Sequence, residues 1–123
     1  MRHARFSIGL AIAVLLAPIA GLLVRPAIAA DEVTLKGEVV DMACYIGQQA
    51  KGPDHKKCAQ KCAEMGQPLG LLAEDGKVYL LIADHVNQAP FQKARQKAGD
   101  QVTIKGSVES HDGVNALTVL DIK

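Results

Sequence analysis

The chain has 123 residues and a formal net charge of +1, with 14 Lys and Arg against 13 Asp and Glu. This length fits one domain, because domains typically hold roughly 100–150 residues. The near balance of charge argues against a nucleic-acid-binding protein, which usually carries a basic excess. Aromatic residues make up 3% of the chain and Trp is absent, so an aromatic platform for stacking bases is not expected.

Residues 1–29 have the three-part pattern of a secretory signal peptide. A short basic segment, residues 1–5, precedes an uncharged apolar run over residues 6–24, and Ala27 and Ala29 are the small residues that signal peptidase requires. We therefore predict cleavage after Ala29 and a periplasmic or secreted bacterial protein that has no membrane contact after cleavage. The alternative is an uncleaved anchor, since the run approaches the ~20 residues of a membrane span.

The remaining residues, 30–123, are predicted to form a single domain built mainly from β-strands. Alternating apolar and polar residues indicate the first strand. Short apolar runs on either side of an Asp-Gly turn at 75–76 indicate a hairpin. A helix is predicted between two of the strands, with Asn87 as a plausible N-cap and Gly99 just beyond its end. The predicted elements are a strand over 33–42, a hairpin over 69–83, the helix over 87–98, and strands over 101–109 and 114–122 with a turn at 111–113.

Two of these strands contain nearly the same seven residues. Residues 33–39 read VTLKGEV and residues 102–108 read VTIKGSV, which agree at five of seven positions. Each copy has a central glycine, Gly37 and Gly106, and glycine within a strand is typical of a bulge or a tight bend. We interpret the two segments as equivalent strands of a coiled barrel that bend at these glycines.

The order of elements and these glycine-centred strands resemble the small secreted bacterial OB-fold proteins. The matching segments are L-K-G-E-V at 35–39 and I-K-G-S-V at 104–108. The resemblance implies a mainly β fold with two short helices, in which a five-stranded barrel carries a helix before its fourth strand. A helical Cys/His insertion over residues 43–68 would then separate the first and second strands. The pattern V-V-D-x-x-C-Y … G-P-D-H-x-x-C-A-x-x-C-A also resembles an uncharacterised group of secreted bacterial proteins, from which no activity follows.

The Cys/His insertion contains all three cysteines of the chain. Pro53 and Asp54 indicate the start of a helix, and Gly66 indicates its end. Residues 55, 58 and 62 stand at i, i+3 and i+7 on this helix, so their side chains share one face. A further cysteine at the end of the first strand is expected to close over that face. The predicted ligand set is Cys44, His55, Cys58 and Cys62.

Three cysteines and a histidine form a known tetrahedral set for Zn²⁺, and thiolate-rich sites also select Cu(I). We therefore predict one Zn²⁺ or Cu(I) ion, held for storage or for delivery to another periplasmic protein. Asp41 is a candidate to orient the histidine or to cap the adjoining loop. Met42 and Met65 are candidate thioether ligands or core filler. His85 could approach the insertion, although an isolated loop histidine is usually solvated.

Two alternatives to a metal site remain open from the sequence. A disulfide between Cys44 and either Cys58 or Cys62 would staple a protein-interaction module and leave one spare thiol. Cys58 and Cys62 could instead act in thiol–disulfide exchange, because a helix N-terminus lowers thiol pKa values. No general acid–base pair or nucleophile–base pair is visible, so the sequence favours a binding protein over an enzyme.

Overall fold

The computed structural model describes residues 31–123, and the signal peptide predicted for residues 1–29 lies outside the described residues. Five strands, three short helices and one 3₁₀ turn make up the described part of the chain. In chain order they are β1 (Glu32–Asp41), α1 (Met42–Gln48), η1 (Pro53–His55), α2 (Lys56–Glu64), β2 (Leu69–Ala73), β3 (Val78–Ala83), α3 (Ala89–Gln96), β4 (Gln101–His111) and β5 (Val114–Ile122).

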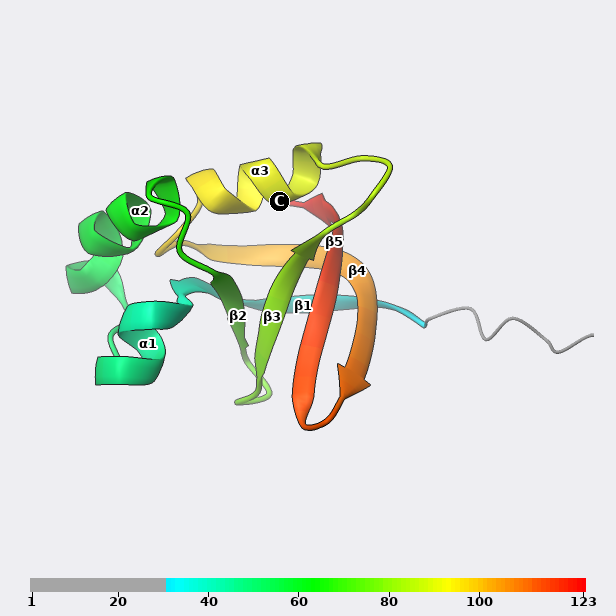
Figure 1. Cartoon of the computed structure of the whole chain (residues 1–123), viewed down its shortest axis with the longest axis horizontal. Coiled ribbons are helices and arrows are strands. Elements are labelled where there is room, and N and C mark those ends of the chain that lie inside the picture. Colours follow the sequence, from blue (N-terminus) through cyan, green and yellow to red (C-terminus); the bar gives the residue numbers. More distant parts are fainter. Residues whose placement is uncertain (1–30) are drawn as a thin grey trace, which may run out of the picture.

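The five strands close into a barrel in the order β1-β2-β3-β5-β4, with β4 paired back to β1 (Figure 1). All neighbouring strands are antiparallel except β3 and β5, which run parallel. The helix α3 connects β3 to β4, as the resemblance to OB-fold proteins implies. The predicted fold class, a mainly β five-stranded barrel with a helical insertion between β1 and β2, is confirmed.

Both glycines of the repeated seven-residue segment lie where two strands approach closely. β1 pairs with β4 in its first part and with β2 in its second part, and Gly37 pairs with both neighbours. A Cβ atom at Gly37 would overlap the carbonyl oxygen of Leu72, and one at Gly106 would overlap that of Thr118. The register between β4 and β5 shifts at Gly106. Glycine is therefore required at both positions because neighbouring backbone fills the space of a side chain.

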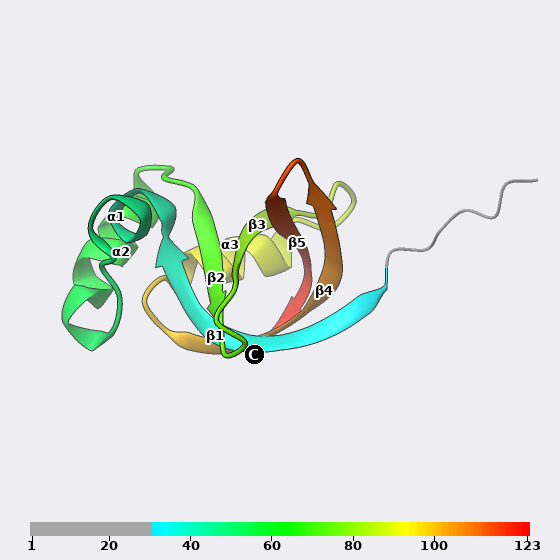
Figure 2. The same ribbon diagram turned by 90° about the horizontal axis from the view of Figure 1, so that it is seen from below.

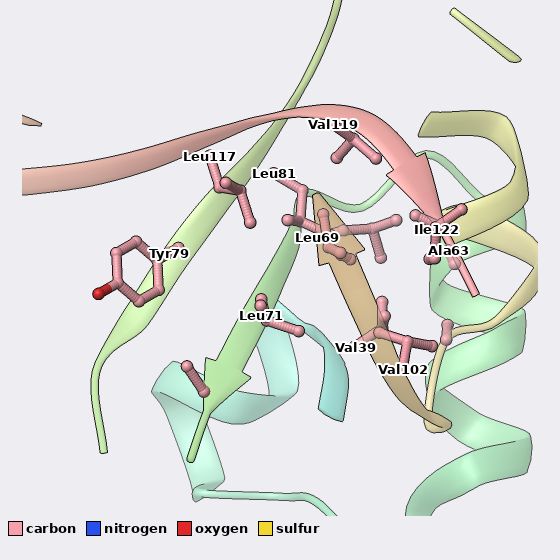
Figure 3. Packing of buried hydrophobic residues seen from close by; sticks show 14 of the residues in the cluster. Val39, Ala63, Leu69, Leu71, Tyr79, Leu81, Val102, Leu117, Val119 and Ile122 are labelled. Carbon is pink, nitrogen blue, oxygen red and sulfur yellow. The ribbon is translucent and has the colours of Figure 1, made fainter. Parts of the chain in front are cut away.

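The interior of the barrel is filled by aliphatic side chains from all five strands (Figure 3). Its largest fully buried residues are Leu69, Leu71, Ile104, Leu117 and Ile122. The fully buried residues that the helices add to this core are alanines: Ala59 and Ala63 of α2, Ala94 of α3, and Ala98 just after α3. Phe91 of α3 packs against the core and is partly buried. Small side chains let both helices pack closely against the barrel.

The structure adds a third helix, α1, to the two that the sequence predicts. β1 ends at Asp41 rather than at Met42, because the Asp41 side chain accepts the backbone N–H of Cys44 and caps α1. Cys44 consequently lies in the first turn of α1 and not at the end of the first strand. In α3 the N-cap position is held by Gln88, one residue after the predicted Asn87. The Asn87 side chain still accepts the N–H of Ala89, at 3.2 Å.

The insertion, which in the structure runs over residues 42–68, stands at one end of the barrel. Figures 1 and 2 show α1 and α2 together beside the β1 and β2 ribbons in both views. The two ends of the insertion meet, since the N–H of Met42 donates to the carbonyl of Pro68 at 2.8 Å. Between residues 31 and 123, no helix has the length and apolar character needed to cross a membrane.

Candidate metal site

The rotation of α2 about its axis is set by two buried alanines. Ala59 and Ala63 are one turn apart and pack into the core, and a cysteine immediately precedes each of them. Consecutive residues on an α-helix are about 100° apart. Burying the alanines therefore turns Cys58 and Cys62 away from the barrel centre and along a neighbouring face of α2.

Both ends of α2 are held in place. At the amino end, Lys56 Nζ donates to Asp100 Oδ1 at 2.5 Å. At the carboxyl end, the N–H groups that follow the helix turn back to its last carbonyls, with Gly66 at φ +88°; this is the Schellman motif. Arg95 of α3 also donates to the carbonyl of Ala63 at 2.8 Å. The helix that carries two cysteines is thus fixed independently of any ligand.

The three thiols converge between α1 and α2. The sulfur atoms of Cys44, Cys58 and Cys62 all lie within 4.8 Å of one another. All three cysteines are free thiols in this structure; Cys58 is exposed, and the other two are half-buried. Soft sulfur ligands at this spacing are compatible with binding of one thiophilic metal ion.

His55 contacts the buried carboxylate of Asp41 beside this group of thiols. Asp41 Oδ2 lies 3.1 Å from His55 Nε2, and the Asp41 side chain is fully buried while that of His55 is 19% exposed. An ionised carboxylate only accepts hydrogen bonds, so Nε2 is the donor and Nδ1 is the nitrogen left for a metal ion. The contact is compatible with the predicted role of Asp41, which is to orient the histidine. Asp41, Cys44 and His55 also each offer a ligand atom within 4.8 Å of the others.

The predicted ligands therefore form two groups that share Cys44. One group holds the three cysteines, and the other holds Asp41, Cys44 and His55. For the three cysteines and His55 to bind one ion together, the Nδ1 atom of His55 must face the three sulfur atoms. The predicted set of Cys44, His55, Cys58 and Cys62 stays a prediction, which this proximity supports.

Burial and contacts with Asp41 favour the protonated form of two of the thiols, Cys44 and Cys62, when no metal is bound. The hydrogen bond from the Cys44 thiol to Asp41, together with burial and the Asp41 charge, raises the pKa of Cys44 to about 12. Burial and the same Asp41 charge raise the pKa of Cys62. For Asp41 itself, burial acts to raise the pKa, but hydrogen bonds from Cys44 and His55 outweigh it and leave the pKa below its usual value.

His85 belongs to neither group, and the two methionines are placed by their own surroundings. The Met42 sulfur lies against Gly70 of β2, where it fills space beside Val78. Met65 follows α2 and is 64% exposed. His85 is exposed in the loop after β3 and lines a surface hollow with β4 and β5 residues. These placements favour packing for Met42 and solvation for His85.

One residue near the site was not singled out from the sequence. Glu38 of β1 is only 7% exposed, and its Oε1 accepts the backbone N–H of Gly52 at 2.7 Å. An acid between Gly37 and Val39 in a strand with buried neighbours was the available signal. Its partner lies 14 residues away in the insertion, so the pairing could not be predicted from local pattern.

Comparison of the chain with protein-family models, with curated proteins and with solved structures gives no match in any of the three. A function is therefore inferred from the chemistry of the site.

Proposed function

We propose that this protein is a periplasmic or secreted metal-binding protein that holds one Zn²⁺ or Cu(I) ion. The ligands are Cys44, Cys58 and Cys62, with His55 as the fourth. The observation that carries the proposal is the convergence of three sulfur atoms from two separate helices within 4.8 Å. The predicted signal peptide supports the compartment, and three thiolates with one imidazole complete a tetrahedral zinc site.

The charge around the thiols favours Zn²⁺ over Cu(I). Three thiolates beside the buried Asp41 carboxylate concentrate negative charge in a small volume. A divalent ion neutralises more of that charge than a monovalent one does. Cu(I) is the second candidate, because the three sulfurs form a complete group without His55 and soft thiolates select this ion.

Thiol–disulfide exchange receives less support from the same geometry. An attacking cysteine must be a thiolate, and such cysteines have lowered pKa values. Here the pKa of Cys44 is raised to about 12 and that of Cys62 is raised as well. A bound cation reverses this situation, since metal coordination deprotonates a thiol. The site therefore suits coordination better than redox exchange.

The exposed position of Cys58 supports storage or delivery of the ion. Cys44 and Cys62 are half-buried, but the Cys58 side chain reaches solvent. A ligand from another periplasmic protein could displace Cys58 first, because ligand exchange requires access to the metal. Delivery through this side of α2 is part of the proposal.

The direct test is metal content together with a thiol count. The chain is purified from the periplasm, its metals are measured by elemental analysis, and thiols are titrated under denaturing conditions with a chelator. We expect about one Zn or Cu per chain and three thiols. A metal-free protein with a single titratable thiol would establish a disulfide and contradict the proposal.

Replacing Cys58 with Ser should lower metal affinity more than about 100-fold. Loss of a group that only orients a ligand lowers metal affinity about 10–100-fold, so loss of a ligand itself should lower the affinity more. His85→Ala is the matched control, since His85 lies outside both groups of ligand atoms, and its affinity should equal that of the wild type. Competition with a chromophoric chelator measures both variants. Unchanged affinity in Cys58→Ser would count against the assignment.

A further inference from the structure

Two buried carboxylates of β1 hold the insertion at separate points. Glu38 accepts the N–H of Gly52 at 2.7 Å, and Asp41 accepts the N–H of Cys44 at 2.9 Å. Burial of a carboxylate is unfavourable unless hydrogen bonds compensate it. For Glu38 the compensating donor comes from the insertion, so this acid ties residue 52 to the barrel.

The hydrogen bond between Glu38 and Gly52 also affects the position of His55. The carbonyl of Gly52 accepts the N–H of His55 at 3.0 Å, and the His55 ring contacts Asp41. The backbone of His55 is therefore positioned from Glu38 and its ring from Asp41. Gly52 has φ +82°, a conformation that glycine adopts readily. A hydrogen bond to a charged acceptor fixes the loop at this turn.

The three cysteines do not depend on this tie. Cys44 is positioned by the cap of α1 at Asp41, and Cys58 and Cys62 are positioned by the packing of α2 through its alanines. Loosening Gly52 would therefore move the imidazole and leave the sulfur group in place.

We propose that Glu38 is a positioning residue that sets metal selectivity. By fixing Gly52 it holds His55 where the imidazole can serve as the fourth ligand, which favours four-coordinate Zn²⁺ over Cu(I) held by three thiolates. This inference rests on the proposed metal site. The site is then tuned for a four-coordinate divalent ion by an acid that acts through the backbone of Gly52.

The test compares Zn²⁺ and Cu(I) affinities of Glu38→Ala and the wild type by chelator competition. We expect Zn²⁺ affinity to fall about 10-fold, as for other groups that orient a ligand, and Cu(I) affinity to stay unchanged. Glu109→Ala is the control, because it removes an exposed acid from β4 with the same change in charge; both affinities should remain those of the wild type. Equal losses for the two ions in Glu38→Ala would overturn the proposal, since a purely structural role weakens both.

A double-mutant cycle with His55→Ala tests the route of action. If Glu38 acts through His55, Glu38→Ala costs no further Zn²⁺ affinity once His55 is absent. Additive losses would contradict this. If Glu38→Ala does not fold, Glu38→Gln decides the matter: its amide oxygen still accepts from Gly52 but more weakly, so Zn²⁺ affinity alone should fall roughly threefold. A wild-type chain that binds neither ion would instead refute the metal site itself.

Discussion

Asp41 joins the barrel to the candidate site through three donors. Its carboxylate accepts the backbone N–H of Cys44, the ring of His55 and the Cys44 thiol. The first bond starts α1, the second orients the imidazole, and the third keeps Cys44 protonated in the absence of metal. One buried acid therefore controls both the geometry and the protonation of the site.

The protonation of Cys44 predicts an order of thiol reactivity in the metal-free protein. Because its pKa is raised to about 12, only about one Cys44 in 10⁴ is a thiolate at pH 8. Iodoacetamide with a chelator present should therefore alkylate the exposed Cys58 well before Cys44, as peptide mass spectrometry can measure. Asp41→Asn should increase the rate at which Cys44 is alkylated, since it removes the negative charge that keeps the Cys44 thiol protonated. Equal rates for Cys44 and Cys58 in the wild type would contradict the prediction.

Asp41 should also make the metal-free fold sensitive to acid. Its folded-state pKa lies below the unfolded value of 3.8, so its contribution is present above about pH 4 and is lost as pH falls through the folded pKa. Urea midpoints between pH 6 and pH 3, with a chelator, measure this loss. Asp41→Asn should be less stable than the wild type at pH 6 by about 1–3 kcal/mol. Its urea midpoint should also decrease less steeply between pH 6 and pH 3. Parallel profiles would refute the role of Asp41, because the other acids are common to both chains.

At the scale of elements, the sequence predicts what local periodicity controls. Alternation predicts the first strand, and helical spacing predicts that Cys58 and Cys62 lie on one face of α2. His55 precedes that helix in η1, and its ligand atom groups with those of Asp41 and Cys44, so the shared face with the two cysteines stays a prediction. The sequence does not predict α1, because none of its residues is buried and the helix therefore has no apolar periodicity. Its first residue is also held by a long-range contact, the hydrogen bond from the Met42 N–H to the Pro68 carbonyl. The contact of Glu38 with Gly52 is also long-range, because it forms only when the insertion folds back onto β1, and local periodicity does not predict it.

Two glycines of the insertion should respond oppositely to alanine. Gly66 ends α2 at φ +88°, where an L-residue is strained, so Gly66→Ala should destabilise the fold by about 1 kcal/mol. Gly47 lies inside α1 at negative φ with open space around it, so Gly47→Ala should stabilise by up to about 1 kcal/mol. Chemical denaturation with a chelator measures both. The same sign of change at the two positions would contradict the assigned cap.

For the whole molecule, the hydrophobic core and the candidate site are separate. The core is built from all five strands, and the insertion adds to it only Ala59 and Ala63 of α2. The thiols lie outside that core, between α1 and α2. The barrel therefore does not need the ion in order to bury its apolar side chains, unlike small domains whose metal replaces a core.

This separation predicts that the metal-free chain folds and that metal adds stability through binding alone. Circular dichroism of the chain with a chelator should show a cooperative thermal transition. Free Zn²⁺ at 100 times its Kd should add about 2.7 kcal/mol, which raises the Tm of a domain of this size by about 10–20 °C. Cys58→Ser should match the wild type with a chelator and gain little from Zn²⁺, because only the bound ion distinguishes the two. An unfolded metal-free chain would show instead that the insertion and the barrel fold as one unit around the ion.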